Sequence, residues 1–292
     1  MKIATGNYHG TEELVWISDK GPIQIRRIAE LRGLDEGFWT STRLFQDGEK
    51  AQSTIRGMVD WAQREGLEPD AEPTEWMAPV SHPGKIICVG LNYRPHAAES
   101  ALEVPETPVL FSKFQNAIVG TDATISAPAD SHQMDYEAEL VIVMGRHCAK
   151  ASESDALSYV YGYCNGNDFS ARDLQFRTSQ WLLGKSADGF GAMGPYVVTA
   201  DEIADPDQLE IIGTRNGQEV QHSNTREMIF SCRYLISYIS HYMTLEPGDV
   251  IFTGTPEGVI LGQSPDTREW LQPGEQVDVK VQGLGELITH IG

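Results

Sequence analysis

The chain has 292 residues, of which 40% are hydrophobic and 22% charged, a composition typical of folded globular proteins and unlike that of disordered, collagenous or coiled-coil chains. A chain of this length corresponds to about two domains and can bury roughly three quarters of its unfolded surface. Its 22 basic residues stand against 42 acidic ones, and the net charge of −20 would repel phosphate backbones and anionic lipids, which excludes nucleic acids and membranes as expected partners.

The cysteines and the N-terminus indicate the expected compartment. Cys88, Cys148, Cys164 and Cys232 are widely spaced and form no C-x-x-C pair, which argues against a zinc knuckle or a disulfide scaffold. The N-terminal residues contain no apolar segment of signal-peptide length, and no stretch approaches the roughly 18 apolar residues of a transmembrane helix. We therefore expect a cytoplasmic protein.

The first part of the chain is predicted to form a small accessory α+β domain. The runs EELVWISD (12–19) and PIQIRRIAEL (22–31) indicate extended segments leading into a helix, and residues 48–65 place Ile55, Met58 and Val59 at helical spacing. Four prolines follow within residues 67–84, and the residue before each proline is restricted to extended geometry. We place the boundary there, between an accessory domain of residues 1–78 and a main domain of residues 79–292.

The main domain is predicted to be rich in short strands. Apolar runs bounded by Gly, Pro, Asn or Asp indicate strands, and one amphipathic helix is expected over Thr225–Met243. The runs are 85–91, 108–114, 139–145, 159–165, 194–199, 209–217, 249–255 and 276–283. The expected fold class is α+β, with most of the strands in the main domain.

The segment DYEAEL (135–140) contains the most unusual charge pattern in the chain. It places Asp135, Glu137 and Glu139 at alternate positions directly before an apolar run, so on a strand all three carboxylates would point to one face. Three acids on one face repel one another and need either full solvation or a cation. Two interpretations are open: a solvated edge strand, or a site where Glu137 and Glu139 are oxygen ligands for Mg²⁺ or Mn²⁺.

Further candidates are Asp168 and Lys185, which follow the run YVYGYC, and His96 and Glu99, which precede it. Asp168 is suited to cap a following helix or to bind a metal ion, and Lys185 by itself is typical of a surface lysine. His96 and Glu99 are spaced to share a helical face, which also fits an ordinary polar helix turn.

One apparent nucleotide-binding motif carries little weight. The segment from Gly189 to Gly194 matches G-x-G-x-x-G, but Pro195 and a strand-like run follow it where a dinucleotide-binding fold needs a helix. The histidines contain no H-E-x-x-H or H-x-H pair, so a histidine-based zinc site is not expected either.

Six segments, taken in chain order, make the sequence resemble the fumarylacetoacetate hydrolase family. They are GLNYRPHAAE (90–99), PVLFSK (108–113), DYEAEL (135–140), NDFSARDLQ (167–175), GKS (184–186) and GDVIFTGTP (248–256). The resemblance spans about residues 85–292, and the MKIATG start is similar to the small N-terminal domain of bacterial members. It implies a mixed β-sandwich roll for the main domain and a homodimer.

The resemblance also implies roles for particular residues. Glu137, Glu139 and Asp168 would be the ligands of Mg²⁺ or Mn²⁺, which favours the metal interpretation over a helix cap at Asp168. Arg172, Gln175, Lys185 and Thr255 would contact the 2-oxo acid end of a small anionic substrate, with Lys185 serving in catalysis. His96, oriented by Glu99, would activate water.

These roles predict a divalent-metal-dependent hydrolase that cleaves a carbon–carbon bond in an acylpyruvate- or fumarylpyruvate-like 2-oxo acid through a metal-stabilised enolate. The same enolate would also serve an oxaloacetate decarboxylase or an isomerase of 2-hydroxy-dienedioates. An alternative from another class is a non-catalytic module that keeps the carboxylates for a structural metal ion.

Overall fold

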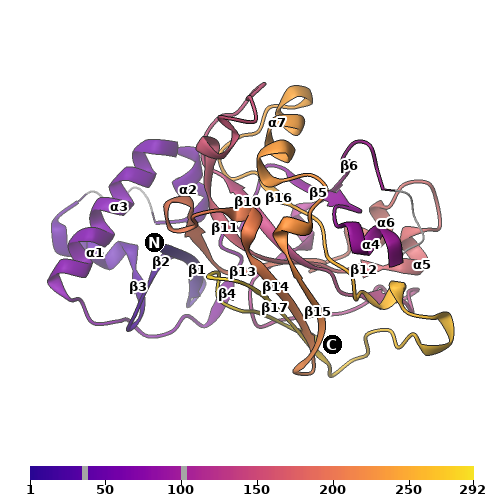
Figure 1. Cartoon of the computed structure of the whole chain (residues 1–292). Helices are drawn as coiled ribbons and strands as arrows, with labels where there is room; N and C mark the ends of the chain where they lie inside the picture. Colours follow the sequence, from indigo (N-terminus) through magenta and orange to yellow (C-terminus); the bar gives the residue numbers. More distant parts are fainter. Residues whose placement is uncertain (35–38, 100–103) are drawn as a thin grey trace.

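The computed structural model describes residues 1–34, 39–99 and 104–292, and one large mixed sheet dominates it (Figure 1). The strands follow the order β3-β2-β1-β13-β11-β10-β16-β5-β6, while β4 pairs with β1 and β7 with β13. Their bounds are β1 Lys2–Tyr8, β2 Thr11–Ser18, β3 Gly21–Gln24, β4 Glu75–Met77, β5 Ile86–Gly90, β6 Val109–Lys113, β7 Ile118–Val119, β10 Ala138–Met144, β11 Val160–Asp168, β13 Gly191–Thr199 and β16 Val250–Phe252.

A second sheet packs against the main one and completes a sandwich. Its strand order is β15-β14-β17-β18-β8, and β14 and β17 lie against β10 of the main sheet. The bounds are β8 Ala123–Ile125, β14 Glu210–Arg215, β15 Gln218–Asn224, β17 Gln276–Val281 and β18 Leu287–Ile291. Alternate residues of β10 point to opposite faces, so Leu140 and Ile142 join the core between the sheets while Val141 and Val143 face the other core. The predicted β-rich α+β class is confirmed.

Three helices cover the N-terminal strands at the end of the molecule away from α5 and α6 (Figure 1). They are α1 (Ile25–Arg32), α2 (Ser41–Gln46) and α3 (Gly48–Glu65). Ile55, Met58 and Val59 of α3 are buried, as their spacing predicts, and the helix is capped after Glu65 by Gly66, whose φ of 64° is left-handed. The helix predicted over residues 48–65 is confirmed.

The N-terminal segment is continuous with the main sheet. Strand β1 pairs antiparallel with β13, placing Lys2 opposite Val198 and Ile3 opposite Val197. The core beneath α1 and α3 also includes Val141 and Val143 of β10. The two parts on either side of residue 78 thus share a sheet and a core. The domain boundary at residue 78 stays a prediction.

Two expectations about the main domain differ in outcome. The helix expected from Thr225 is shorter than predicted: α7 runs from Cys232 to Tyr242. It begins at Cys232 because the Ser231 side chain caps it by accepting a hydrogen bond from the Tyr234 amide. Just before the helix, the Phe230 amide donates to the Asn92 side chain at 2.8 Å. The glycine motif lies largely in strand β13, which runs from Gly191 to Thr199, so no helix follows it, as expected.

All four cysteines are buried free thiols. Within residues 1–34, 39–99 and 104–292, no helix has the length and apolar character needed to span a membrane.

Candidate metal centre and active site

Three carboxylates meet where the paired strands β10 and β11 come together. Glu139 lies in β10, Asp168 ends β11, and Glu137 directly precedes β10. The register sets Ala138 opposite Asn167, and the Asp168 amide donates to the Glu137 carbonyl at 3.0 Å. One oxygen from each of the three side chains lies within 4.8 Å of the others, and all three residues are buried. The structure therefore brings together the three predicted metal ligands, although Asp168 lies 29 positions after Glu139 in the sequence.

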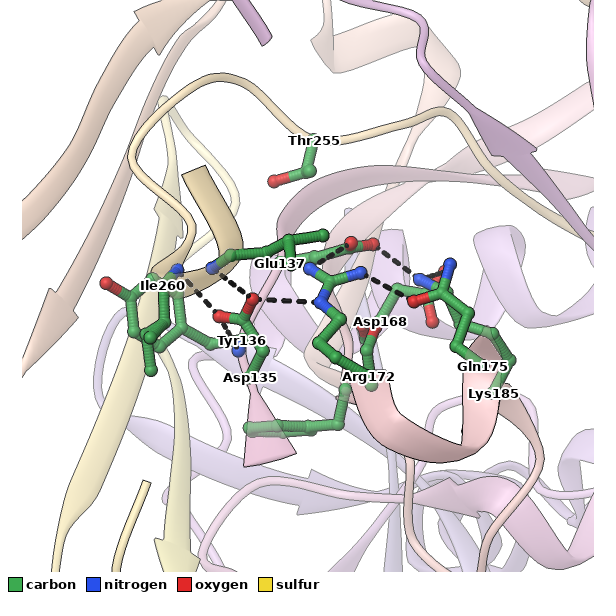
Figure 2. A network of polar contacts seen from close by, with 12 residues as sticks. Asp135, Tyr136, Glu137, Asp168, Arg172, Gln175, Lys185, Thr255 and Ile260 are labelled. Carbon is green, nitrogen blue, oxygen red and sulfur yellow. Dashed lines mark hydrogen bonds and ion pairs between the residues drawn. The ribbon is translucent and has the colours of Figure 1, made fainter. Parts of the chain in front are cut away.

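Asp135 does not share a strand face with the two glutamates, so that part of the prediction is wrong. It lies in β9 (Met134–Asp135), which pairs with β12 (Ser170–Ala171), and β10 begins only at Ala138. The Asp135 carboxylate instead accepts hydrogen bonds from the amides of Ile260 and Leu261, at 2.9 and 3.0 Å, and from Arg172 Nε at 2.9 Å (Figure 2). With its oxygens occupied in this way, Asp135 anchors the site.

Asp168 is not a helix cap. Helix α5 (Arg172–Gln175) has Ala171 as its N-cap residue, and β12 separates that helix from Asp168. The Asp168 carboxylate oxygens accept no hydrogen bond among the described residues, although two lysines form ion pairs with them. Buried carboxylate oxygens in this state are suited to bind a cation.

Lys185 is a buried residue, so the surface interpretation of this lysine is wrong. Helix α6 (Leu182–Lys185) ends at it, and its Nζ lies 2.8 Å from Glu137 Oε2 and 3.3 Å from Asp168 Oδ2. Burial by itself would lower the pKa of Lys185, but the negative charges of Asp168 and Glu137 outweigh it and raise that pKa above the ordinary value. The raised pKa favours the ammonium form of Lys185, paired with these two carboxylates.

Lys113 belongs to the site although the sequence analysis assigned it no role. It ends strand β6, and its Nζ lies 2.5 Å from Asp168 Oδ1 and 3.2 Å from the carbonyl of Phe169. No acidic residue lies next to Lys113 in the sequence to indicate an ion pair, so the signal that could have identified it was its place in the PVLFSK segment.

Arg172 links the anchor to the carboxylate cluster. Its Nε contacts Asp135 and its Nη2 lies 2.7 Å from Glu137 Oε1, while its Nη1 donates to Gln175 Oε1 at 2.9 Å (Figure 2). The side chain is only 3% exposed, so these charged contacts are shielded from solvent. The structure thus shows Arg172 fixing the positions of Glu137 and Gln175; the substrate contacts predicted for Arg172 and Gln175 stay predictions.

The buried cluster contains more acidic than basic side chains. With every group ionised, four carboxylates face three basic side chains, which leaves one net negative charge; the groups are Asp135, Glu137, Glu139, Asp168, Lys113, Arg172 and Lys185. Burial would raise the pKa of Glu137, but the charges of Lys185 and Arg172 lower it to about 2. Burial and the charges of Asp168 and Glu137 instead raise the pKa of Glu139 well above its ordinary value.

The residues therefore fit a divalent cation. Three hard oxygen donors are the chemistry that Mg²⁺ and Mn²⁺ prefer. Glu139 receives a backbone hydrogen bond from Gly254 at 2.7 Å but pairs with no lysine or arginine in the described part of the chain. A cation between the three carboxylates would supply the positive charge that Glu139 lacks.

A cavity of about 420 Å³ opens beside the cluster and collects most of the predicted site residues. Thr255 is buried in its wall, where the hydroxyl accepts a hydrogen bond from Gln221 Nε2 at 2.9 Å. The predicted residues in the wall are His96, Glu137, Arg172, Gln175, Lys185 and Thr255, and apolar side chains including Val89, Phe111 and Trp181 complete it. Its volume suits a small organic acid.

His96 is buried in this wall and belongs to α4 (Arg94–Glu99). The side chain of Glu99 lies outside the described residues, so its predicted role in orienting His96 stays a prediction.

Metal binding is expected to depend on pH through Glu139. Because the pKa of Glu139 is raised well above its ordinary value by burial and by the charges of Asp168 and Glu137, this carboxyl keeps its proton to higher pH than an ordinary glutamate and must release it to become a ligand. The affinity for Mn²⁺ should therefore increase as pH rises until that pKa is passed. Titration calorimetry in buffers of different ionisation enthalpy should detect the released proton, and the release should disappear in Glu139→Gln. Mn²⁺ affinity independent of pH would contradict this assignment.

Comparison with known proteins agrees with this geometry. Residues 85–292 match the C-terminal domain of fumarylacetoacetate (FAA) hydrolase. The mitochondrial oxaloacetate tautomerase of Rattus norvegicus is 40% identical over 253 residues, covering 86% of this chain and 79% of the relative.

Two solved structures share the architecture. The 5-carboxymethyl-2-hydroxymuconate delta-isomerase of Mycobacterium smegmatis is 31% identical with a TM-score of 0.75, and the match covers 100% of this chain and 98% of that one. Fumarylpyruvate hydrolase of Pseudomonas aeruginosa, solved with Mn²⁺ and pyruvate, is also 31% identical, with a TM-score of 0.65 and coverage of 71% and 88%. These relatives are enzymes named for three different reactions. By its match over residues 85–292 and its identity with these relatives, the chain belongs to the fumarylacetoacetate hydrolase family.

Proposed function

We propose that this protein is a divalent-metal-dependent enzyme that enolises a 2-oxo acid, and that its reaction is the keto–enol tautomerisation of an oxaloacetate-like substrate. The observation that carries the proposal is the buried carboxylate triad, because its member Glu137 and the neighbouring Lys185 line a cavity sized for a small acid. The 40% identity with an oxaloacetate tautomerase over 86% of the chain supports this reaction over the others found in the family.

The reaction moves one proton from carbon 3 of the acid to its 2-oxo oxygen. A divalent ion held by Glu137, Glu139 and Asp168 would supply Lewis acidity toward the 2-oxo group. The Lys185 ammonium is held in place by Glu137 and adds a fixed positive charge where negative charge develops on oxygen. His96 is the wall residue suited to accept the proton from carbon 3 and deliver it to the 2-oxo oxygen, because Lys185 and Arg172 are cations paired with carboxylates.

Hydrolysis of a carbon–carbon bond in an acylpyruvate is the second candidate. It is favoured by the placement of His96 in the same cavity wall as Lys185, where a histidine can activate water instead of exchanging a substrate proton. The structural likeness to a fumarylpyruvate hydrolase supports it as well. Decarboxylation of oxaloacetate would use the same groups.

One experiment separates these reactions. Mn²⁺-loaded protein in D₂O is expected to accelerate deuterium incorporation at carbon 3 of oxaloacetate, followed by NMR, with little release of pyruvate. Mn²⁺ alone at the same concentration is the control, since a free metal ion also promotes enolisation. Cleavage of acetylpyruvate without enhanced exchange would favour the hydrolase, and release of pyruvate from oxaloacetate would favour the decarboxylase. The homodimer and the cytoplasmic location stay predictions.

A further inference from the structure

Arg268 contributes a further positive charge to the cavity, and the sequence analysis did not identify it. It lines the same cavity as Glu137 and Lys185. The segment that carries it is anchored at both ends on β9: the Leu261 amide donates to Asp135 and the Leu271 amide donates to the Met134 carbonyl at 3.0 Å. These two bonds hold the segment against the catalytic cluster.

The guanidinium of Arg268 is oriented but not neutralised. Its Nε donates to the Gln263 carbonyl at 2.9 Å, and the group lies 6.0 Å from the ring centroid of Trp270. No acidic side chain within the described residues forms an ion pair with it. Its Nη groups keep the planar, two-pronged donor geometry that matches a carboxylate.

The other cations of the cavity wall already have carboxylate partners. Lys185 pairs with Glu137 and Asp168, and Arg172 pairs with Asp135 and Glu137. The predicted 2-oxo acid end of a substrate would be held at the metal cluster. A second anionic group on the same substrate would find Arg268 as the cation that has no acidic partner.

We infer that Arg268 selects substrates that carry a second carboxylate, at the end of the molecule remote from the 2-oxo acid group. This inference rests on the proposed function and deepens it, because it names the residue that would recognise the second carboxylate of an oxaloacetate-like acid. Arg268 is a specificity-determining residue that binds substrate and takes no part in proton transfer.

Matched pairs of ligands test the inference through binding alone. Each pair consists of a dicarboxylic 2-oxo acid and the monocarboxylic 2-oxo acid of equal length, with four carbons (oxaloacetate and 2-oxobutyrate) and five (2-oxoglutarate and 2-oxovalerate). Kd values are measured on Mn²⁺-loaded protein. Titration calorimetry gives them for 2-oxoglutarate and the two monocarboxylic acids, and competition with 2-oxoglutarate at low temperature gives the value for oxaloacetate. The wild type should prefer the dicarboxylic member of at least one pair.

Arg268→Gln should weaken binding of that dicarboxylic acid by about 10- to 100-fold, the usual effect of losing hydrogen bonds to a charged group, and leave its monocarboxylic partner unchanged. Arg268→Lys should recover part of the preference because it keeps the charge without the two-pronged geometry. Arg226→Gln is the matched control, since Arg226 is 61% exposed and pairs with Glu227.

Three results would overturn the inference: no preference in the wild type, a preference that survives in Arg268→Gln, or equal weakening of both members of a pair. The last result would place Arg268 at the shared 2-oxo acid end. Failure of the proposed function is distinguishable, because it would appear as absent deuterium exchange in the wild type whatever the binding preference.

Discussion

Glu139→Gln is expected to abolish the enolisation activity and to lower the affinity for Mn²⁺ by more than about 100-fold, since loss even of groups that only support metal ligands costs about 10- to 100-fold. The amide keeps a similar shape and an oxygen that can accept the hydrogen bond from Gly254. It removes the charge that the cation would neutralise. Titration calorimetry with Mn²⁺ and the deuterium-exchange assay measure the two effects.

The control for this variant is Glu286→Gln, which changes an exposed glutamate paired with Lys280 on the surface. It should leave metal affinity and activity unchanged. If Glu139→Gln bound Mn²⁺ as tightly as the wild type, the assignment of the triad as the metal site would be wrong.

His96→Ala is expected to slow deuterium exchange at carbon 3 of oxaloacetate by about 10²- to 10⁴-fold, the usual contribution of a positioned acid–base group. Mn²⁺ affinity should not change, because His96 does not belong to the cluster of candidate metal ligands. Measuring acetylpyruvate cleavage in the same variant distinguishes the two candidate functions. If only cleavage falls and exchange survives, His96 activates water and the hydrolase is the correct function.

A matched control is His82→Ala, because His82 is exposed and does not line the cavity. Equal losses in both histidine variants would indicate a general effect on stability. A loss confined to His96→Ala would place the proton transfer at that side chain.

The sequence by itself determined the fold class, the α3 helix and the three carboxylates that the fold brings together. Local patterns were sufficient where a property repeats along the chain: the 3.6-residue spacing of Ile55 and Val59 gave a correctly bounded helix, and the acids at 137 and 139 indicated a cation site. The resemblance of six segments then added Asp168, for which local reasoning left a helix cap and a metal ligand open. Pairing of β10 with β11 makes the ligand interpretation possible, since it brings Asp168 opposite Glu137 and into one cluster with Glu139.

Only the tertiary structure decided how the charges around these ligands are paired. Lys185 meets Glu137 across 48 positions of sequence, and no pattern in a single chain shows which distant charges become neighbours. For the same reason the sequence did not reveal the roles of Lys113 and Arg268. It also predicted that Asp135 shares a strand face with the two glutamates, whereas Asp135 lies in β9. A charge on a strand end or a loop acquires its role from the partners that the fold places beside it, because burial makes each unpaired charge costly and each pairing specific.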